Sequence, residues 1–432
     1  MFSTRYVRDN LEQLRKSLDK RKSDFPLDEL LQKDEAIRKI GKQLQDLRAE
    51  RNKGSKEISD VKKSGKEPDK ALIEKMAKVR DQIESLEKEL PEDEKRVEEL
   101  LWNLPNILHE SVPYGKDDSE NVEIRKWGEI KQRDVPGHEE ILTKLDLVDL
   151  EQAAKVAGAR FFYLKGDLAL LEQSLMRFAI DTLVKKGFTL IAPPLLLKRE
   201  YYRGVTALGD FEDALYRAAD PKEASEKKEL EHVEDDLFLI STSEHPMAVL
   251  YADKVFGAKE LPKKLVGVSP CFRREAGAHG KDSKGIFRVH QFYKIEQFVF
   301  SKPEDSWKIH EELIGNAEEI FQKLKLPYHV VNICTGDIGV VAAKKYDLEA
   351  WVAAQKKYRE MVSCSNCTDW QALRLNIKYD EAGKRNYVHT LNSTAVATNR
   401  CLIAIIENYV NDDGTITVPD VLVPYMGKSK IG

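Results

Sequence analysis

Two apolar seams in the first hundred residues constrain the fold of this chain more than any other feature. In each seam, over residues 30–61 and 72–100, apolar residues recur at alternating steps of three and four. This spacing is typical of helices that pack in a coiled coil. Between the seams, Gly65 suits the end of one helix, while Pro68 and Asp69 suit the start of the next. The sequence therefore predicts an antiparallel helical hairpin.

Three residues within the seams depart from the apolar pattern. Arg51 and Gly54 take the two seam positions near the far end of the first helix. Pro91 lies inside the second seam, and it predicts a kink or an interruption because proline has no backbone N–H to donate.

Charge is distributed unevenly along the predicted hairpin. Residues 42–80 hold twelve Lys/Arg and seven Asp/Glu, a balance of +5, whereas residues 81–100 hold three and nine, a balance of −6. Two interpretations stay open. The charges belong to a solvated helical surface, or the basic part follows the phosphate backbone of an RNA. The whole chain carries a net charge of only −4, so an RNA site requires this local concentration of positive charge.

The length of 432 residues predicts two domains, which we place at residues 1–110 for the helical hairpin and 111–432 for a larger body. The five cysteines form an odd set without framework spacing, which favours a reducing compartment. The first residues show no apolar signal core, and no apolar run reaches membrane-spanning length. We therefore expect a soluble, cytoplasmic protein with no membrane partner.

Two segments of the body carry the first candidate site residues. In residues 185–197, a helix ends near Lys185 and a strand begins after a glycine and leads to Pro193-Pro194; taken alone, this is an ordinary helix–strand junction. In residues 237–246, a strand delivers Thr242, Ser243 and Glu244 at its end. Hydroxyls beside a carboxylate suit a polar ligand with an ammonium group, although the same residues suit a turn or helix cap.

A third segment, residues 268–300, predicts an antiparallel hairpin whose loop runs from residue 276 to 285. We expect Arg273 and Glu275 to share one face of its first strand. Likewise Arg288, Phe292 and Glu296 are expected to share one face of its second strand. Arginine can hold a phosphate, an aromatic ring can stack on a base, and a carboxylate can hold an ammonium.

A fourth group of residues follows in the last quarter of the chain. Glu360 and Ser363 offer oxygen ligands for a Mg²⁺ ion that phosphates hold for the most part, or they are ordinary residues of an exposed strand. A later segment passes from a strand end through Asn392, Ser393 and Thr394 into an apolar helix that bears Arg400. The pair Cys364 and Cys367 has no second pair at zinc spacing, so we interpret both as buried cysteines.

Taken in order, these segments resemble the signature motifs of class II aminoacyl-tRNA synthetases. GFTLIAPP is similar to motif 1, FRRE through RVHQF to motif 2, and TAVATNR to motif 3. The N-terminal hairpin, TSE, HQFYKIEQF, SCSNCTDWQALR, HTLNST and the ending VPDVLVPYMG resemble seryl-tRNA synthetases specifically. The resemblance implies an α+β fold, with an antiparallel sheet flanked by helices. The charged stretch 217–236 resembles a surface insertion of the archaeal or eukaryotic-like cytosolic branch.

The resemblance also implies the ligands ATP, Mg²⁺ and L-serine. It makes Arg273 and Arg400 catalytic, with Arg273 at the α-phosphate and Arg400 with Arg288 at the γ-phosphate end, and it makes Glu360 and Ser363 metal ligands. The implied ATP site consists of Arg273, Arg274, Glu275, Arg288, Val289, Phe292, Glu360, Met361, Val362, Ser363 and Arg400. The implied serine site consists of Thr242, Ser243, Glu244, Arg273, Glu296, Asn392 and Thr394.

The resemblance further implies a homodimer, because Pro194 matches the motif 1 proline at the dimer interface. The hairpin is then expected to bind the long variable arm of serine tRNA. The implied activity is that of a serine–tRNA ligase. Two alternatives stay open: a class II enzyme for another amino acid or a carrier protein, and a non-catalytic RNA-binding relative.

Overall fold

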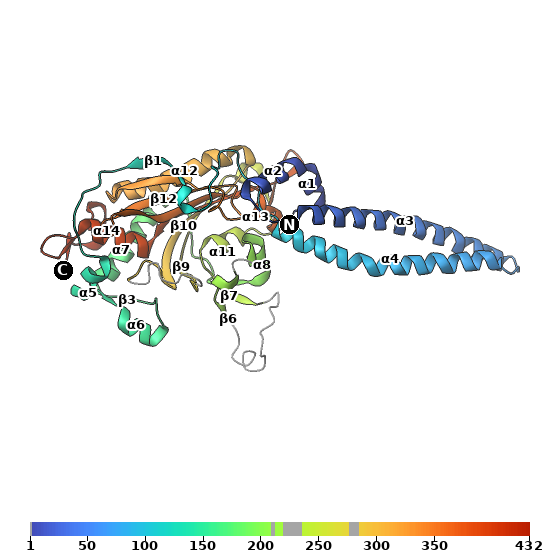
Figure 1. The fold of residues 1–432 in the computed structure, drawn as a ribbon, viewed down its shortest axis with the longest axis horizontal. Helices are drawn as coiled ribbons and strands as arrows, with labels where there is room; N and C mark the ends of the chain where they lie inside the picture. The colour runs from blue at the N-terminus through green and yellow to red at the C-terminus, as the bar shows by residue number, and fades with distance from the viewer. Residues whose placement is uncertain (1, 209–211, 219–235, 276–284) are drawn as a thin grey trace. The chain divides into compact units, whose positions relative to one another are not determined.

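The computed structural model describes residues 2–208, 212–218, 236–275 and 285–432 (Figure 1). The chain divides into two compact units, one from Phe2 to Leu104 and one from Pro105 to Gly432. The division falls six residues before the predicted boundary because residues 105–110 are tied to the second unit. The Asn106 amide donates hydrogen bonds to the carbonyls of Val341 and Cys367, at 2.8 and 2.7 Å.

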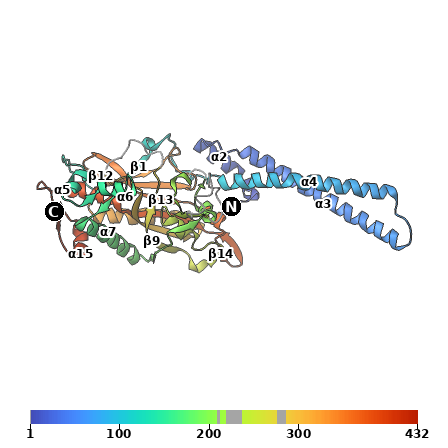
Figure 2. The ribbon, with the colours of Figure 1, turned by 90° about the horizontal axis from the view of Figure 1, so that it is seen from below.

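The first unit is helical. Its elements are α1 (Thr4–Asp9), α2 (Leu11–Arg21), α3 (Leu27–Lys63) and α4 (Lys70–Asn103). Helices α3 and α4 lie side by side in both views, as predicted for the hairpin (Figures 1 and 2). Gly65 adopts a φ of 75° after α3, and the Asp69 carboxylate caps α4 by accepting a hydrogen bond from Ala71 N. Leu44, Val79 and Ile83 form the buried centre of the α3–α4 contact.

The departures from the seam pattern have three different outcomes. Gly54 is buried, and a Cβ there would lie 2.2 Å from the Met76 sulfur, so glycine lets the two helices approach. Arg51 is exposed rather than part of the seam. Helix α4 continues through Pro91, so an interruption there is not observed. Pro91 is exposed, and the one intrahelical hydrogen bond that it cannot donate therefore removes no buried contact.

The second unit is built on an eight-stranded sheet in the order β1-β11-β12-β13-β16-β10-β9-β4. All neighbouring strands pair antiparallel except β4 and β9, which are parallel. The strands are β1 (Val122–Trp127), β4 (Thr189–Ile191), β9 (Lys263–Phe272), β10 (Gln291–Ser301), β11 (Tyr328–Asn332), β12 (Lys344–Val352), β13 (Lys357–Asn366) and β16 (His389–Ala397).

Helices and four small sheets complete this unit (Figure 1). The helices are α5 (His138–Lys144), α6 (Leu150–Ala157), α7 (Gly166–Lys185), α8 (Arg199–Val205), α11 (Glu244–Val249), α12 (Ser306–Lys323), α13 (Trp370–Leu375), α14 (Thr398–Tyr409) and α15 (Val423–Met426). The small sheets use β2 (Val148–Asp149), β3 (Tyr163–Leu164), β5 (Leu196–Lys198), β6 (Arg217–Ala218), β7 (Leu237–Leu239), β8 (Val255–Gly257), β14 (Lys378–Glu381), β15 (Lys384–Tyr387), β17 (Ile416–Thr417) and β18 (Lys430–Ile431).

The two faces of β10 show how the sheet divides core from site. Ile295 and Val299 point into the larger hydrophobic core, to which α7, α12 and α14 contribute. Gln297, also on this face, donates a hydrogen bond to Leu313 O and accepts one from Asn316, both on α12. Phe292, Lys294 and Glu296 face the other way and line the cavity described below. Farther along the same face, Phe298 and Phe300 pack in a second hydrophobic core.

Several sequence predictions are confirmed in this unit. Helix α7 ends at Lys185, β4 follows it before Pro193-Pro194, and β9 and β10 form an antiparallel hairpin. The loop 276–284 and most of the predicted insertion 217–236 lie outside the described residues. Among the residues that are described, no helix is long and apolar enough to cross a bilayer.

The hairpin core gives a test of the fold. Ile83 is 4% exposed, whereas Ile73 on the same helix is 47% exposed. We expect Ile83→Ala to lower the free energy of opening of the hairpin by about 2–4 kcal/mol, because it leaves a cavity between α3 and α4. Hydrogen exchange of hairpin amides measures this, with Ile73→Ala as the matched control. Equal acceleration of exchange by both variants would contradict the packing described here.

Candidate active site

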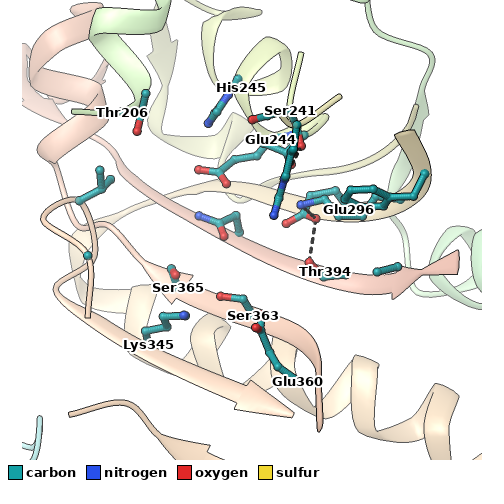
Figure 3. Close-up of a pocket in the computed structure, with 18 of the residues that line it drawn as sticks. Thr206, Ser241, Glu244, His245, Glu296, Lys345, Glu360, Ser363, Ser365 and Thr394 are labelled. Carbon is teal, nitrogen blue, oxygen red and sulfur yellow. Dashed lines mark hydrogen bonds and ion pairs between the residues drawn. The ribbon is translucent and has the colours of Figure 1, made fainter. Parts of the chain in front are cut away.

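A cavity of about 520 Å³ opens on the face of the large sheet from which Lys294 and Glu296 of β10 project. Strands β10, β12, β13 and β16 contribute side chains to it, and the segment before α11 and the start of α14 close its sides. Figure 3 shows Glu244 and Glu296 above the strand that carries Thr394, with Glu360, Ser363 and Ser365 on the strand next to it.

Two irregularities in strand pairing decide which side chains reach this cavity. In β13, Val362 pairs with Leu348 but Glu360 pairs with Glu349, so Met361 is an extra residue. Residues three apart, such as Glu360 and Ser363, would face opposite sides of a regular strand, and the bulge returns both to the cavity. In β16, Ala395 is extra in the same way, since Glu296 pairs with Thr394 while Ile295 pairs with Val396.

One end of the cavity holds a buried acidic group. The Lys294 ammonium lies 2.7 Å from the Glu296 carboxylate, and the Thr394 hydroxyl donates to the same carboxylate at 3.1 Å. Glu244 approaches from the start of α11 and accepts a hydrogen bond from the Gln371 amide at 3.1 Å. Among the described side chains, Lys294 forms the ion pair with Glu296, and a ligand cation would give the neighbouring Glu244 a charged partner as well.

The protonation of the acidic group follows from its enclosure. Burial first and the nearby Glu296 carboxylate second raise the pKa of Glu244 to about 7, against the opposing effect of Lys294. Burial also raises the pKa of Glu296, against the effect of Lys294 and Thr394. A ligand ammonium placed between the two carboxylates would lower both pKa values and favour the ionised forms.

Arg273, Arg288 and Arg400 also line the cavity. The Arg273 guanidinium stacks 5.4 Å from the Phe292 ring centroid and donates to Ser241 O. Arg288 lies 3.2 Å from the Glu275 carboxylate. A planar cation beside an aromatic ring can take a phosphate and a base on adjoining surfaces.

Arg400 and Glu360 form the remaining wall. Arg400 donates to Glu360 O at 2.9 Å and lies 3.2 Å from the Glu360 carboxylate. Desolvation acts to raise the pKa of Glu360, but Arg400 and Lys345 outweigh it, so the pKa of this carboxyl group lies below its usual range. Lys345 is itself paired with buried Asp347 at 3.2 Å. Glu360 is therefore held as a carboxylate facing the cavity.

Most of the predicted site residues are brought together. Those that line the cavity are Thr242, Glu244, Arg273, Glu275, Arg288, Val289, Phe292, Glu296, Glu360, Met361, Ser363, Asn392, Thr394 and Arg400. Three are not: the Ser243 side chain packs against Gly267, Arg274 lines a separate hollow with Glu212, and Val362 lies in the hydrophobic core. Their side chains face away because strand alternation and the turn before α11 direct them there.

The local placement of some residues differs from the prediction. Arg273 and Glu275 lie beyond the end of β9, and Arg288 precedes β10, so these three do not belong to strand faces. Glu275 has a φ of 48°, which ends the extended conformation. Asn392, Ser393 and Thr394 lie within β16 rather than after it, because pairing with β10 continues to Ala397.

Sequence reasoning missed other residues that line the cavity, among them Lys294, Lys345 and His245. Lys294 stands two positions from both Phe292 and Glu296 on β10, so alternation alone would have found it. Lys345 and His245 carry no local signal; they reach the cavity through the pairing of β12 with β13 and through the orientation of α11. Burial lowers the pKa of His245 to about 3, and Lys294 and Arg273 add to the effect, so this imidazole is neutral.

Two pairs of residues are candidate metal ligands, Cys364 with Cys367 and Glu360 with Ser363, and neither pair alone can complete the coordination of a metal ion. Within the described ranges, no three His, Cys, Asp or Glu side chains are grouped to hold a metal ion. Cys364 and Cys367 are free and buried, as predicted, as are Cys271, Cys334 and Cys401. Glu360 and Ser363 place two oxygen ligands on one side of the cavity, which fits Mg²⁺ that substrate phosphates hold in large part.

The antiparallel sheet and the arginine-lined cavity define a class II aminoacyl-tRNA synthetase core. Residues 227–409 match the family described as tRNA synthetase class II core domain (G, H, P, S and T), and residues 1–108 match the seryl-tRNA synthetase N-terminal domain. The chain belongs to the seryl-tRNA synthetase family.

Individual relatives agree over the whole length. A serine–tRNA ligase of Methanocella arvoryzae is 51% identical, covering 99% of this chain and 99% of its own. The crystal structure of seryl-tRNA synthetase from Pyrococcus horikoshii complexed with ATP is 46% identical, with a TM-score of 0.90 over 100% of this chain and 99% of that one. The cytoplasmic serine–tRNA ligase of Naegleria fowleri, solved in complex with AMP, is 37% identical, with a TM-score of 0.84 over 98% and 95%.

The raised pKa of Glu244 predicts a pH dependence of stability. Because the folded chain holds this proton up to about pH 7 and the unfolded chain releases it near pH 4.5, the unfolding free energy should fall as pH rises between these values. In the absence of ligands, we expect the decrease in unfolding free energy over this pH range to be about 1–3 kcal/mol smaller in Glu244→Gln than in the wild type. Thermal unfolding from pH 5 to 8 measures it, and Glu200→Gln, an exposed control, should keep the wild-type slope. Identical slopes in all three proteins would rule out the enclosure of Glu244.

Proposed function

We propose that this chain is a serine–tRNA ligase, which activates serine with ATP and then transfers it to the 3′ end of serine tRNA. The observation that carries the proposal is the pair of enclosed carboxylates, Glu244 and Glu296, with the Thr394 hydroxyl, beside a wall of arginines. This arrangement accepts an amino-acid ammonium and a hydroxyl next to a polyphosphate. The serine–tRNA ligases that match the full chain support the same activity.

The nucleotide is placed by the arginine end of the cavity. Arg273 contacts the α-phosphate, and Phe292 and Glu275 take the adenine side. Arg288 and Arg400 hold the γ-phosphate end, so that the triphosphate bends across the sheet. The ATP in the Pyrococcus horikoshii complex supports a nucleotide at this site. The position of Arg273 over the Phe292 ring, 5.4 Å from its centroid, supports this placement.

Glu360 and Ser363 are the residues that would hold Mg²⁺. The ion, when bound with ATP, supplies charge neutralisation to the phosphates. The bulge at Met361 is what lets both oxygens face the nucleotide, and Arg400 keeps the Glu360 carboxylate ionised and oriented.

Activation is a displacement at phosphorus for which the chain supplies position and charge. A serine carboxylate oxygen attacks the α-phosphorus, the bond from that phosphorus to the bridging oxygen breaks, and pyrophosphate leaves with seryl-adenylate formed. Arg273 stabilises the negative charge that develops on the α-phosphate. The terminal ribose hydroxyl of the tRNA then attacks the activated carbonyl carbon, and AMP leaves. Neither step requires a side-chain nucleophile.

Selection of serine depends on the polar end of the cavity. Alanine lacks the hydroxyl and would leave buried polar groups such as Thr394 and Glu296 without a partner, which is costly. Threonine carries an additional methyl group and has to be excluded by lack of space.

The hairpin domain, residues 1–110, is proposed to bind the long variable arm of the tRNA, and residues 111–432 to perform the chemistry. The basic balance of residues 42–80 supports phosphate contacts. We also propose a cytoplasmic homodimer. Exposed apolar side chains surround Pro194, with Leu190 at 49%, Leu195 at 39% and Leu196 at 38%, and a second copy would cover them. No observation favours the non-catalytic or carrier-loading alternatives.

Amino-acid-dependent ATP–pyrophosphate exchange tests the activation step. We expect exchange with serine and not with alanine or threonine. Arg273→Ala should reduce it at least about 100-fold, because the charge on the α-phosphate is no longer stabilised in the transition state. Arg177→Ala, an exposed arginine on α7, is the matched control and should keep wild-type exchange. Absence of serine-dependent exchange in the wild type would overturn the proposed function.

Removal of distal hairpin charges tests the tRNA assignment. In Lys56→Ala/Lys63→Ala, we expect the KM for serine tRNA to rise about 10-fold and its salt dependence to weaken, while exchange stays unchanged. The control is Lys88→Ala/Lys95→Ala, which removes the same charge from the acidic part of α4. Equal loss of aminoacylation in both double variants would instead favour a general effect of charge.

A further inference from the structure

A buried histidine–glutamate pair lies behind the cavity without lining it. His138 begins α5 and is 7% exposed, and Glu407 lies in α14 and is 1% exposed. The His138 Nδ1 atom lies 2.9 Å from Glu407 Oε1, which also accepts from His138 N at 3.1 Å. Glu407 Oε2 accepts from Ala354 N at 2.9 Å. The carboxylate thus receives three N–H groups, and all of its contacts are internal to the fold.

The other ring nitrogen of His138 fixes the tautomer. Ile286 N lies 3.3 Å from His138 Nε2, and a backbone N–H can only donate. Nε2 therefore accepts, which leaves the proton on Nδ1 to be donated to Glu407. The pair is a directed chain of hydrogen bonds from the Ile286 amide through the imidazole to the carboxylate.

Glycine is required where the ring meets the backbone. Gly285 has a φ of 70°, and a Cβ at this position would lie 2.1 Å from His138 Nε2. Any other residue would push the imidazole away from the Ile286 amide. The sequence thus provides the space that the His138 contact needs.

The anchored backbone leads directly into the nucleotide side of the cavity. Asn399 of α14 donates to Ile286 O at 2.9 Å and to Phe287 O at 3.1 Å, so His138 and Asn399 hold this segment together. Phe287 lies 5.0 Å beneath the Arg400 guanidinium, and Arg288 follows it in the chain. Arg288 and Arg400 face the cavity from two different parts of the sequence.

Glu407 connects the same contact to two further elements. It lies two helical turns after Arg400 on α14, and Ala354 belongs to the connection between β12 and β13, the strand that carries Glu360. The Glu407 carboxylate therefore links α14 directly to α5 and to the β12–β13 connection. Through the His138 ring, it also links α14 to the segment 285–287. These elements deliver Arg400, Glu360 and Arg288 to one cavity.

We propose that His138 and Glu407 are positioning residues for the nucleotide site: they hold the Ile286–Phe287 backbone against α14 so that Arg288 and Arg400 contact the same polyphosphate. The inference rests on the proposed function for the identity of the nucleotide, but it concerns residues that touch no substrate. Loss of the pair should weaken ATP binding and leave serine binding at the far end of the cavity intact.

Two substitutions separate the halves of the contact. His138→Asn retains a group at the position of Nδ1 and loses the contact to Ile286, whereas His138→Gln reaches toward Ile286 and loses the proper donor to Glu407. For both, we expect the KM for ATP in pyrophosphate exchange to rise about 5- to 30-fold, as for a lost buried hydrogen bond, with the KM for serine within about twofold of wild type. The ATP-induced rise in Tm should shrink in parallel.

His329→Asn is the matched control. His329 lies between two carboxylates, 2.8 Å from Glu123 and 2.8 Å from Glu349, and does not line the cavity. It should lower Tm in the absence of ATP without changing the KM for ATP. Folded His138 variants with a wild-type KM for ATP and a wild-type ATP-induced Tm rise overturn the proposal.

Two further outcomes keep the test decisive. Should His138→Asn not fold, Glu407→Gln and His138→Gln are judged by the same criterion. If the wild type shows no serine-dependent exchange while the His138 variants lose the ATP-induced Tm rise, the proposed function fails and the positioning role stands.

Discussion

The backbone pairing of β10 with β9 on one side and β16 on the other is the constraint on which the site depends. It gives β10 a paired strand on each side and so fixes the row of Phe292, Lys294 and Glu296 along one face of the sheet. The bulges in β13 and β16 then rotate neighbouring side chains into the same space. A one-residue slip in any of these pairs would turn the row toward the hydrophobic core. The hydrogen-bond register of the strands therefore decides which side chains line the site, and the chemistry of those side chains acts only once the register is set.

Enclosing charge at the sheet has a thermodynamic cost that a ligand offsets. Lys294 pairs with Glu296, and burial raises the pKa of both Glu244 and Glu296. A cation placed between these two carboxyl groups would favour their ionised forms. At the opposite wall the balance is reversed, since Arg400 and Lys345 favour the ionised form of Glu360. One cavity thus holds carboxyl groups of raised pKa, Glu244 and Glu296, together with one of lowered pKa, Glu360.

Much of this arrangement is predictable from the sequence, and what is not has physical reasons. The hairpin seams, the end of α7 at Lys185 and the β9–β10 pairing depend on local periodicity, which one sequence displays. Ordered motifs gave the cavity residues from Thr242 to Arg400. The roles of Lys345 and of the His138–Glu407 pair could not be predicted from the sequence, because each depends on contacts between segments far apart in the chain. The bulge at Met361 could not be predicted because it depends on the partner strand. Glu360 and Ser363 can be paired as oxygen ligands from their residue types and spacing, but regular alternation would have placed them on opposite faces.

The five cysteines give the larger unit a distinct chemical property. All five are buried and free, and burial raises the pKa of Cys271, Cys364, Cys367 and Cys401 far enough that little thiolate exists at neutral pH. Alkylating reagents and oxidants act on the thiolate, so the native fold protects these sulfurs without any disulfide. Four of them lie in or next to strands of the large sheet or in the helix that follows it. Labelling of these thiols will consequently measure how often the strands of the sheet open and expose them. The folded enzyme should not react with the same reagents.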